Sequence, residues 1–196
     1  MALLGADAAD QAALIRLFLP DSLRGRERDL AIAHLADERD RNPEIVVRTP
    51  AAPSSAHALE VDPGAPAPGF AALLQAHPDY RLALARVYPP LRDVLARDLI
   101  RAVAARNAAI AALSALPEVV PNPLSLLLAV GEMGSDTVLL TANQIGLCFQ
   151  LAALRGELVG WRVQLGPIAG IVAGGLGWRT LARELVGLIP AGVGLA

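Results

Sequence analysis

The first part of the chain alternates short helical patterns with loops. Residues 7–20 have the apolar spacing of a short helix that ends at Pro20. Residues 21–42 begin with Asp and Ser and then place an apolar stripe among many charges, which predicts an amphipathic surface helix. Residues 43–50, "PEIVVRTP", could form a single strand, but no second convincing strand accompanies them. We therefore expect a short, irregular N-terminal region, with a helical segment over residues 1–48.

The pattern changes on either side of residues 49–69. This segment contains five prolines and is typical of a linker rich in Pro and Ala. Longer helical patterns follow, at about Tyr80–Val87, Pro90–Leu116 and Leu126–Leu154. The expected fold class is therefore all-α, with an apolar helical bundle over residues 70–196 and glycine-rich packing of its C-terminal helix.

One predicted helix has a polar stripe. Glu132, Asp136, Asn143 and Gln150 are spaced by four, seven and seven residues, which places them on one helical face, and Gln144 flanks them. One interpretation is a polar seam that recognises a partner or fixes helix register through buried hydrogen bonds. The other is the solvated face of an amphipathic helix.

Glycines recur near the C-terminus. Gly166, Gly170 and Gly174 are four residues apart, and Gly177 follows three residues later. Small residues at this spacing let another helix approach closely. Each glycine destabilises a helix by roughly 1 kcal/mol relative to Ala, so favourable packing at the stripe is expected to offset this cost. A phosphate-binding loop is the rival interpretation, but "GGLGWR" fits neither the Rossmann nor the P-loop spacing. Close helix packing is the stronger hypothesis.

The segment after the glycines combines Trp178, Arg179 and Arg183. Arg and Trp beside an apolar segment are typical of an interface with lipid headgroups or a protein partner. The alternative is that both Arg side chains bond carboxylates or helix-terminal carbonyls. Two charge-free runs precede them, Thr137–Leu154 with 18 residues and Val163–Trp178 with 16 residues. Both are short against the roughly 20 residues that cross a bilayer.

Composition supports apolar contact. Hydrophobic residues make up 54% of the chain but aromatic residues only 4%, which suits tightly packed helices. The mean hydropathy of +0.45 favours membrane contact or an oligomeric interface. Residues 1–100 have a net charge of −3 and residues 101–196 of +1. Since neither half has a strong positive excess, we expect no nucleic-acid partner.

The sequence lacks residues that several kinds of catalytic and binding site require. All 17 basic residues are Arg, which excludes a P-loop and Schiff-base catalysis because both need Lys. Cys148, the single cysteine, cannot form an internal disulfide, and the three His residues lack ligand spacing. We find no catalytic centre and expect no enzyme activity, metal or cofactor. The first residues lack the pattern of a secretory signal, so the chain is expected to begin in the cytoplasm.

Three sequence words occur in order along the chain: "NAAIAALSALP", "LTANQ" and "WRTLAREL". Together they cover about residues 80–196 and resemble the bacterial YcjF-like, GTPase-associated domain of unknown function. The resemblance implies an apolar helical domain, attached to or encoded beside small GTPases, that touches the inner membrane and has no established enzymatic activity. One departure is Ala142, which stands where family members commonly have a basic residue and so weakens any idea of an anion site.

The expected function is that of a non-enzymatic accessory protein at the cytoplasmic face of the inner membrane. Its expected partners are a small GTPase in trans, inner-membrane lipid and a second copy of itself. The alternative is a soluble helical module in the cytoplasm that regulates a GTPase or self-assembles, since the amides and threonines of residues 137–154 are costly in hydrocarbon. An enzyme would need Glu132, Asp136 and Asn143 to line a closed polar pocket.

Overall fold

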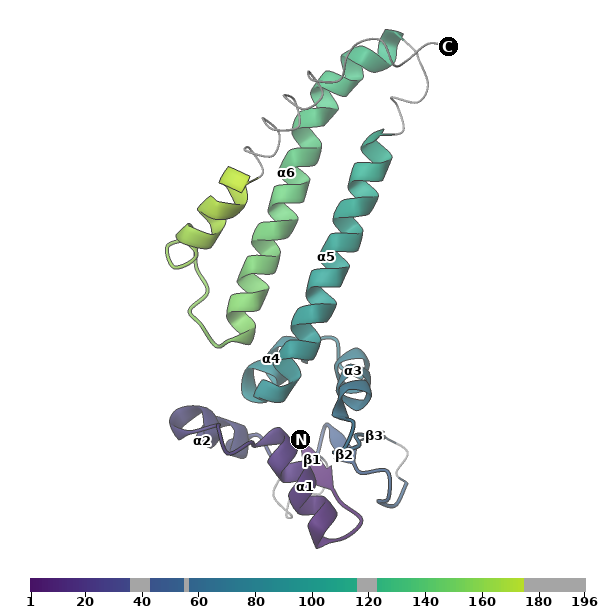
Figure 1. Cartoon of the computed structure of the whole chain (residues 1–196), viewed down its shortest axis with the longest axis vertical. Helices are drawn as coiled ribbons and strands as arrows, with labels where there is room; N and C mark the ends of the chain where they lie inside the picture. The colour runs from purple at the N-terminus through teal and green to yellow at the C-terminus, as the bar shows by residue number, and fades with distance from the viewer. Residues whose placement is uncertain (36–42, 55–56, 116–122, 175–196) are drawn as a thin grey trace. The chain divides into compact units, whose positions relative to one another are not determined.

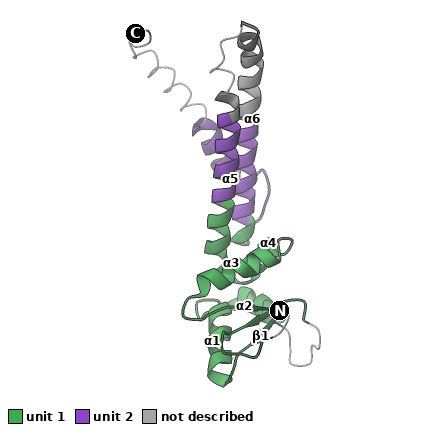
Figure 2. Cartoon of the chain, turned by 90° about the vertical axis from the view of Figure 1, so that its right-hand side faces the viewer, with its two compact units in different colours: residues 1–99, 153–157 green, residues 100–152, 158–196 purple. Residues whose placement is uncertain are grey.

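Two units make up the chain. The computed structural model describes residues 1–35, 43–54, 57–115 and 123–174, with the side chains of 113–137 left out (Figure 1). One unit comprises Met1–Leu99 and Ala153–Glu157, and the other comprises Ile100–Ala152 and Leu158–Ala196 (Figure 2). We call the first the α/β unit and the second the helical unit.

A small parallel sheet lies in the α/β unit. Its strands are β1 (Ala2–Leu4), β2 (Val46–Arg48) and β3 (Ala58–Glu60), in the order β1-β2-β3. The protein is therefore mostly helical but not all-α, which corrects the predicted fold class. Each strand has only three residues, too few to show the two-residue alternation by which strands are recognised. The partners of β2 are set by tertiary pairing, and the sequence around 43–50 alone could not reveal them.

Four helices and a short 3-10 turn accompany the sheet. They are α1 (Ala8–Phe18), α2 (Gly25–Ala33), α3 (Pro66–Ala76), α4 (Arg81–Val87) and η1 (Pro89–Leu91). The carboxylate of Asp7 accepts hydrogen bonds from the backbone N–H of Ala9 and Asp10, which caps the start of α1. Pro66 occupies the first turn of α3, where its missing N–H is not needed.

Aromatic side chains form the centre of the α/β unit. Phe18 is fully buried, with edge-on contacts to Phe70 and Tyr88 at centroid distances of 5.4 and 5.5 Å. Leu14 from α1 and Val47 from the sheet are buried as well. Burial of each such side chain contributes roughly 1.5–3 kcal/mol. The unit thus has a hydrophobic core of its own.

Residues 49–69, expected to be a linker, form part of this unit. They contain β3 and the first residues of α3. A Cβ at Gly69 would lie 2.6 Å from the carbonyl oxygen of Glu60 and 2.8 Å from the Cα of Val61, so the helix approaches the strand more closely than any other residue allows. The chain divides after Leu99 instead of within the proline-rich segment.

Long helices dominate the helical unit. α5 (Arg92–Ala115) lies within the predicted Pro90–Leu116 and contains the boundary between the units, and α6 (Pro123–Leu154) begins close to the predicted Leu126. Residues 165–174 form a further helix. Gly156, with φ of +73°, follows the end of α6, as expected of a glycine that terminates a helix.

Candidate functional site

The clearest surface feature of the helical unit is the connection between α6 and the helix at 165–174, together with the first residue of that helix. Five of its large apolar side chains are exposed, and Leu158 and Trp161 are the most exposed, at 79% and 61%. The others are Val159, Val163 and Leu165. We call residues 158–165 the apolar loop. Exposed apolar side chains gathered in one segment typically mark an interaction site.

A single buried amide holds the apolar loop in shape. Gln164 is 4% exposed; its Oε1 accepts a hydrogen bond from the Gly160 N–H, and its Nε2 donates to the Leu158 carbonyl, both at 3.2 Å. The backbone N–H groups of Val163 and Gln164 also donate to the Gly160 carbonyl. These bonds close the loop around Gln164. The apolar side chains are thereby displayed outward by a defined turn.

Trp161 is anchored on one side. Its ring packs edge-on against Phe149 of α6, with a centroid distance of 5.2 Å and an interplanar angle of 86°. Such a pair contributes about 0.5–1.5 kcal/mol beyond its buried area. Because Trp161 remains mostly exposed, the contact orients the indole and leaves much of it available to a partner. Arg162, the next residue, is exposed too.

The apolar loop was not among the sites predicted from the sequence. The available signal was five large apolar residues within eight positions, four of them at every second position from Val159 to Leu165. Trp161 and Arg162 also repeat the Trp–Arg pairing that drew attention to Trp178 and Arg179. Trp178, Arg179, Arg183 and Gly177 lie outside the described residues.

The predicted polar seam is seen in part. Asn143 is half-buried, and its Nδ2 donates a 2.8 Å hydrogen bond to Oδ1 of Asn107 on α5, so the two helices share a polar contact. Gln144 is exposed and Gln150 is half-buried. Glu132 and Asp136 belong to α6, but their side chains lie outside the described ones. Asn107, the partner of Asn143, was not singled out from the sequence because no local pattern pairs residues 36 positions apart.

The glycine stripe faces open space. A Cβ added at Gly166, Gly170 or Gly174 would meet nothing within 4 Å. Ile168 of this helix and Gln164, just before its first residue, are buried. Within the described residues the three glycines thus have no close neighbour, and their role in helix packing stays a prediction.

The carboxyl edge of the parallel sheet is the usual ligand site of α/β proteins, but here its polar groups bond one another. The buried Thr49 hydroxyl donates to the Asp10 carboxylate at 3.2 Å. Gln11 accepts from the Gly5 N–H and donates to the Leu3 carbonyl. These contacts tie α1 to the strand ends. Within the described residues no cluster of His, Cys, Asp or Glu could hold a metal ion.

No family model, curated protein or solved structure matches the chain. Over the part of the chain that the structure describes, no helix combines the length and apolar character needed to cross a bilayer.

Proposed function

We propose that this protein is a non-enzymatic accessory protein that attaches to the cytoplasmic face of the inner membrane through the apolar loop. The observation that carries the proposal is the display of Leu158, Trp161 and their neighbours by a turn closed around Gln164. A loop that needed these side chains for folding would bury them. This one is held by an amide and leaves them outside.

The composition of the apolar loop suits the boundary between headgroups and acyl chains. Trp prefers this zone because its ring is apolar and its indole N–H can still reach a hydrogen-bond acceptor. Leu158, Val159 and Val163 would supply the apolar area. Arg162 would meet anionic headgroups, a contact worth about 1 kcal/mol near a charged surface. The proposed attachment is peripheral, with the loop lying in the interface.

A separate GTPase remains the proposed partner, and that part rests on the resemblance of residues 80–196 to the YcjF-like domain. The helical unit would then recruit the GTPase to the membrane or respond to it there. Purification of the full-length protein under mild detergent tests this part. If no GTPase co-purifies with it, this part of the proposal is contradicted.

A second candidate is a helical module that binds proteins, including a second copy of itself. The observation favouring it is a separate exposed pair on α6, Val138 at 67% and Leu139 at 51%. Side chains on a helix surface suit helix–helix contact better than lipid insertion of a loop. This candidate predicts concentration-dependent association that Val138→Asn abolishes.

Vesicle flotation tests the first candidate. The full-length protein is mixed with vesicles of phosphatidylcholine alone or with phosphatidylglycerol added, and bound protein is quantified. Leu158→Asn should lower the partition coefficient about fivefold, which corresponds to roughly 1 kcal/mol. Arg162→Gln should weaken binding about as much on anionic vesicles and leave binding to neutral vesicles unchanged.

Val138→Asn is the matched control because it removes a similarly exposed apolar side chain from α6. It should leave flotation unchanged. Equal losses for Val138→Asn and Leu158→Asn would point to general hydrophobicity and contradict the assignment to the apolar loop. Absence of flotation for the unmodified protein on both vesicles would favour the protein-binding module.

A further inference from the structure

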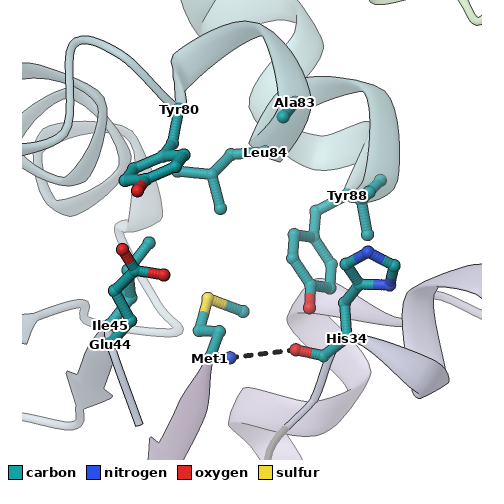
Figure 3. Close-up of a pocket in the computed structure, with 9 residues that line it drawn as sticks. Met1, His34, Glu44, Ile45, Tyr80, Ala83, Leu84 and Tyr88 are labelled. Atoms are coloured by element: carbon teal, nitrogen blue, oxygen red, sulfur yellow. Dashed lines mark hydrogen bonds between the residues drawn. The ribbon is translucent and has the colours of Figure 1, made fainter.

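A second surface feature lies in the α/β unit, at the amino ends of β1 and β2. It is a cavity of about 270 Å³. Its lining residues come from Met1, the ends of α2 and β2, and one face of α4; they are Met1, His34, Glu44, Ile45, Tyr80, Ala83, Leu84, Val87 and Tyr88 (Figure 3). We call it the Tyr80–Tyr88 pocket.

The pocket has an apolar floor and a polar rim. Ile45, Leu84 and Tyr88 are buried, whereas Glu44 and Tyr80 are exposed. In Figure 3 the ring of Tyr80 lies beside the Glu44 carboxylate on one side of the pocket, and the ring of Tyr88 lies on the other side. An apolar body entering the pocket would thus contact the floor while a charged group stays at the rim.

Both phenols keep their protons at neutral pH. A hydrogen bond to Glu44, together with the charge of that carboxylate, raises the pKa of Tyr80 above its ordinary value. Burial raises the pKa of Tyr88 to about 12. Neutral aromatic rings present an electron-rich face that attracts cations. Tyr80 also fixes the position of the carboxylate beside its ring.

The rim beside Tyr80 carries a negative charge. Glu44 is the one carboxylate among the nine lining residues, and none of them is Arg. The one cation of the lining is the Met1 ammonium, which donates a 2.9 Å hydrogen bond to the His34 carbonyl. A ligand ammonium placed at the Tyr80 side of the rim would meet the Glu44 carboxylate and the ring of Tyr80.

We propose that the Tyr80–Tyr88 pocket binds a small organic ammonium compound, with the ammonium held by Glu44 and the ring of Tyr80 and the apolar body resting on Leu84 and Tyr88. Drug-sized ligands occupy pockets of roughly 300–1,000 Å³, so 270 Å³ fits a compound with a single ring or a short alkyl chain. The site lies wholly within the α/β unit and is independent of the apolar loop.

A matched set of three probes tests the proposal on the full-length protein. Phenethylammonium, phenethyl alcohol and phenylpropionate share an aromatic body and differ in charge. Titration is followed by NMR on the backbone amides of Ile45 and residues 80–88. The ammonium should bind about tenfold more tightly than the alcohol, as one charge-assisted hydrogen bond predicts, and the carboxylate should not bind.

Two variants assign the charge preference to named groups. Glu44→Gln can still accept the Tyr80 hydrogen bond, so it should bring the ammonium down to the affinity of the alcohol. Asp29→Asn removes an exposed carboxylate from α2, outside the pocket lining, and should leave the preference intact. Tyr80→Leu should lower the affinity for the ammonium severalfold more than the affinity for the alcohol, because it removes a ring face and keeps an apolar contact.

Three results would overturn the proposal. The first is equal affinity of the ammonium and the alcohol. The second is a preference for the ammonium that survives Glu44→Gln, and the third is the absence of shifts around the pocket with all three probes at millimolar concentrations. Unchanged thermal unfolding of each variant shows that the site, and not the fold, was altered.

Discussion

The two units treat their large apolar side chains in opposite ways. In the α/β unit, Phe18, Leu14, Leu73 and Leu91 are completely buried. Among the described residues of the helical unit, the buried apolar residues are Ala152 and Ile168, while nine large apolar side chains are exposed. The first unit buries many more large apolar side chains than it exposes, the exposed ones being Leu4, Ile15, Leu30, Ile32 and Tyr80. The second offers its own outward, as a unit that works against another surface would.

Truncation at Phe18 should have the largest effect on this comparison. Phe18→Ala removes a fully buried ring from between Phe70 and Tyr88 and should destabilise the α/β unit by about 3–5 kcal/mol. Trp161→Ala should cost the helical unit about 1 kcal/mol, since the indole is 61% exposed. Hydrogen exchange with mass spectrometry, resolved by peptide, reports each unit separately. Similar losses in both units would break the comparison.

Two Gly→Ala substitutions should change the free energy of unfolding in opposite directions. Gly69→Ala places a Cβ against the Glu60 carbonyl and should destabilise the α/β unit by about 1–3 kcal/mol. Gly170→Ala meets open space within a helix and should stabilise the helical unit by about 0.5–1 kcal/mol. Urea unfolding of both variants gives the two values. Destabilisation by Gly170→Ala would show that the stripe is packed against a neighbour in solution.

Alkaline pH should weaken the α/β unit through Tyr88. The pKa of a tyrosine in the unfolded chain is about 10, and burial raises that of Tyr88 to about 12. The folded state therefore keeps a proton that the unfolded state loses, so this contribution is complete below pH 10 and is lost as the pH rises towards 12. Tyr88→Phe removes the titration.

The difference in unfolding free energy between the unmodified protein and Tyr88→Phe should shift in favour of the variant by about 1 kcal/mol between about pH 9 and pH 11. Tyr80→Phe serves as the comparison because that side chain is exposed and should shift less. A pH-independent difference for Tyr88→Phe would contradict the assigned burial.

Loss of the hydrogen bond between Asn107 and Asn143 should have the smallest effect on stability. Asn143→Leu leaves the half-buried Asn107 amide without its partner and should destabilise the helical unit by about 1 kcal/mol. Asn107→Leu combined with Asn143→Leu should recover most of that loss, because two apolar side chains can pack where two amides met. Additive losses in the double variant would show that the amides act independently.

Long helices were predictable and short strands were not. The periodic pattern at Pro90–Leu116 gave α5 almost to the residue, since a helix of this length repeats its apolar spacing many times. β1 and β3 have three residues each and owe their pairing to β2, which no local pattern can indicate. The predicted linker over residues 49–69 failed for a related reason, because its prolines flank β3 and open α3.

The interaction site proposed above uses residues other than those the sequence indicated. Trp178, Arg179 and Arg183 lie outside the described residues, so their role stays a prediction, and the exposed Trp–Arg pair that the structure describes is Trp161 and Arg162. What the sequence could not show is that the buried Gln164 closes the turn that exposes them. The glycine stripe was assigned a packing role from spacing alone, and spacing does not decide which face of a helix turns inward.

The most direct test of the central claim follows Trp161 itself. In a Trp178→Phe background Trp161 is the remaining tryptophan, and its emission is recorded as anionic vesicles are added. Insertion of the apolar loop predicts a blue shift, quenching by lipids brominated near the headgroup, and loss of both when Leu158 is also replaced by Asn. Vesicle binding with unchanged, unquenched Trp161 emission would contradict the account.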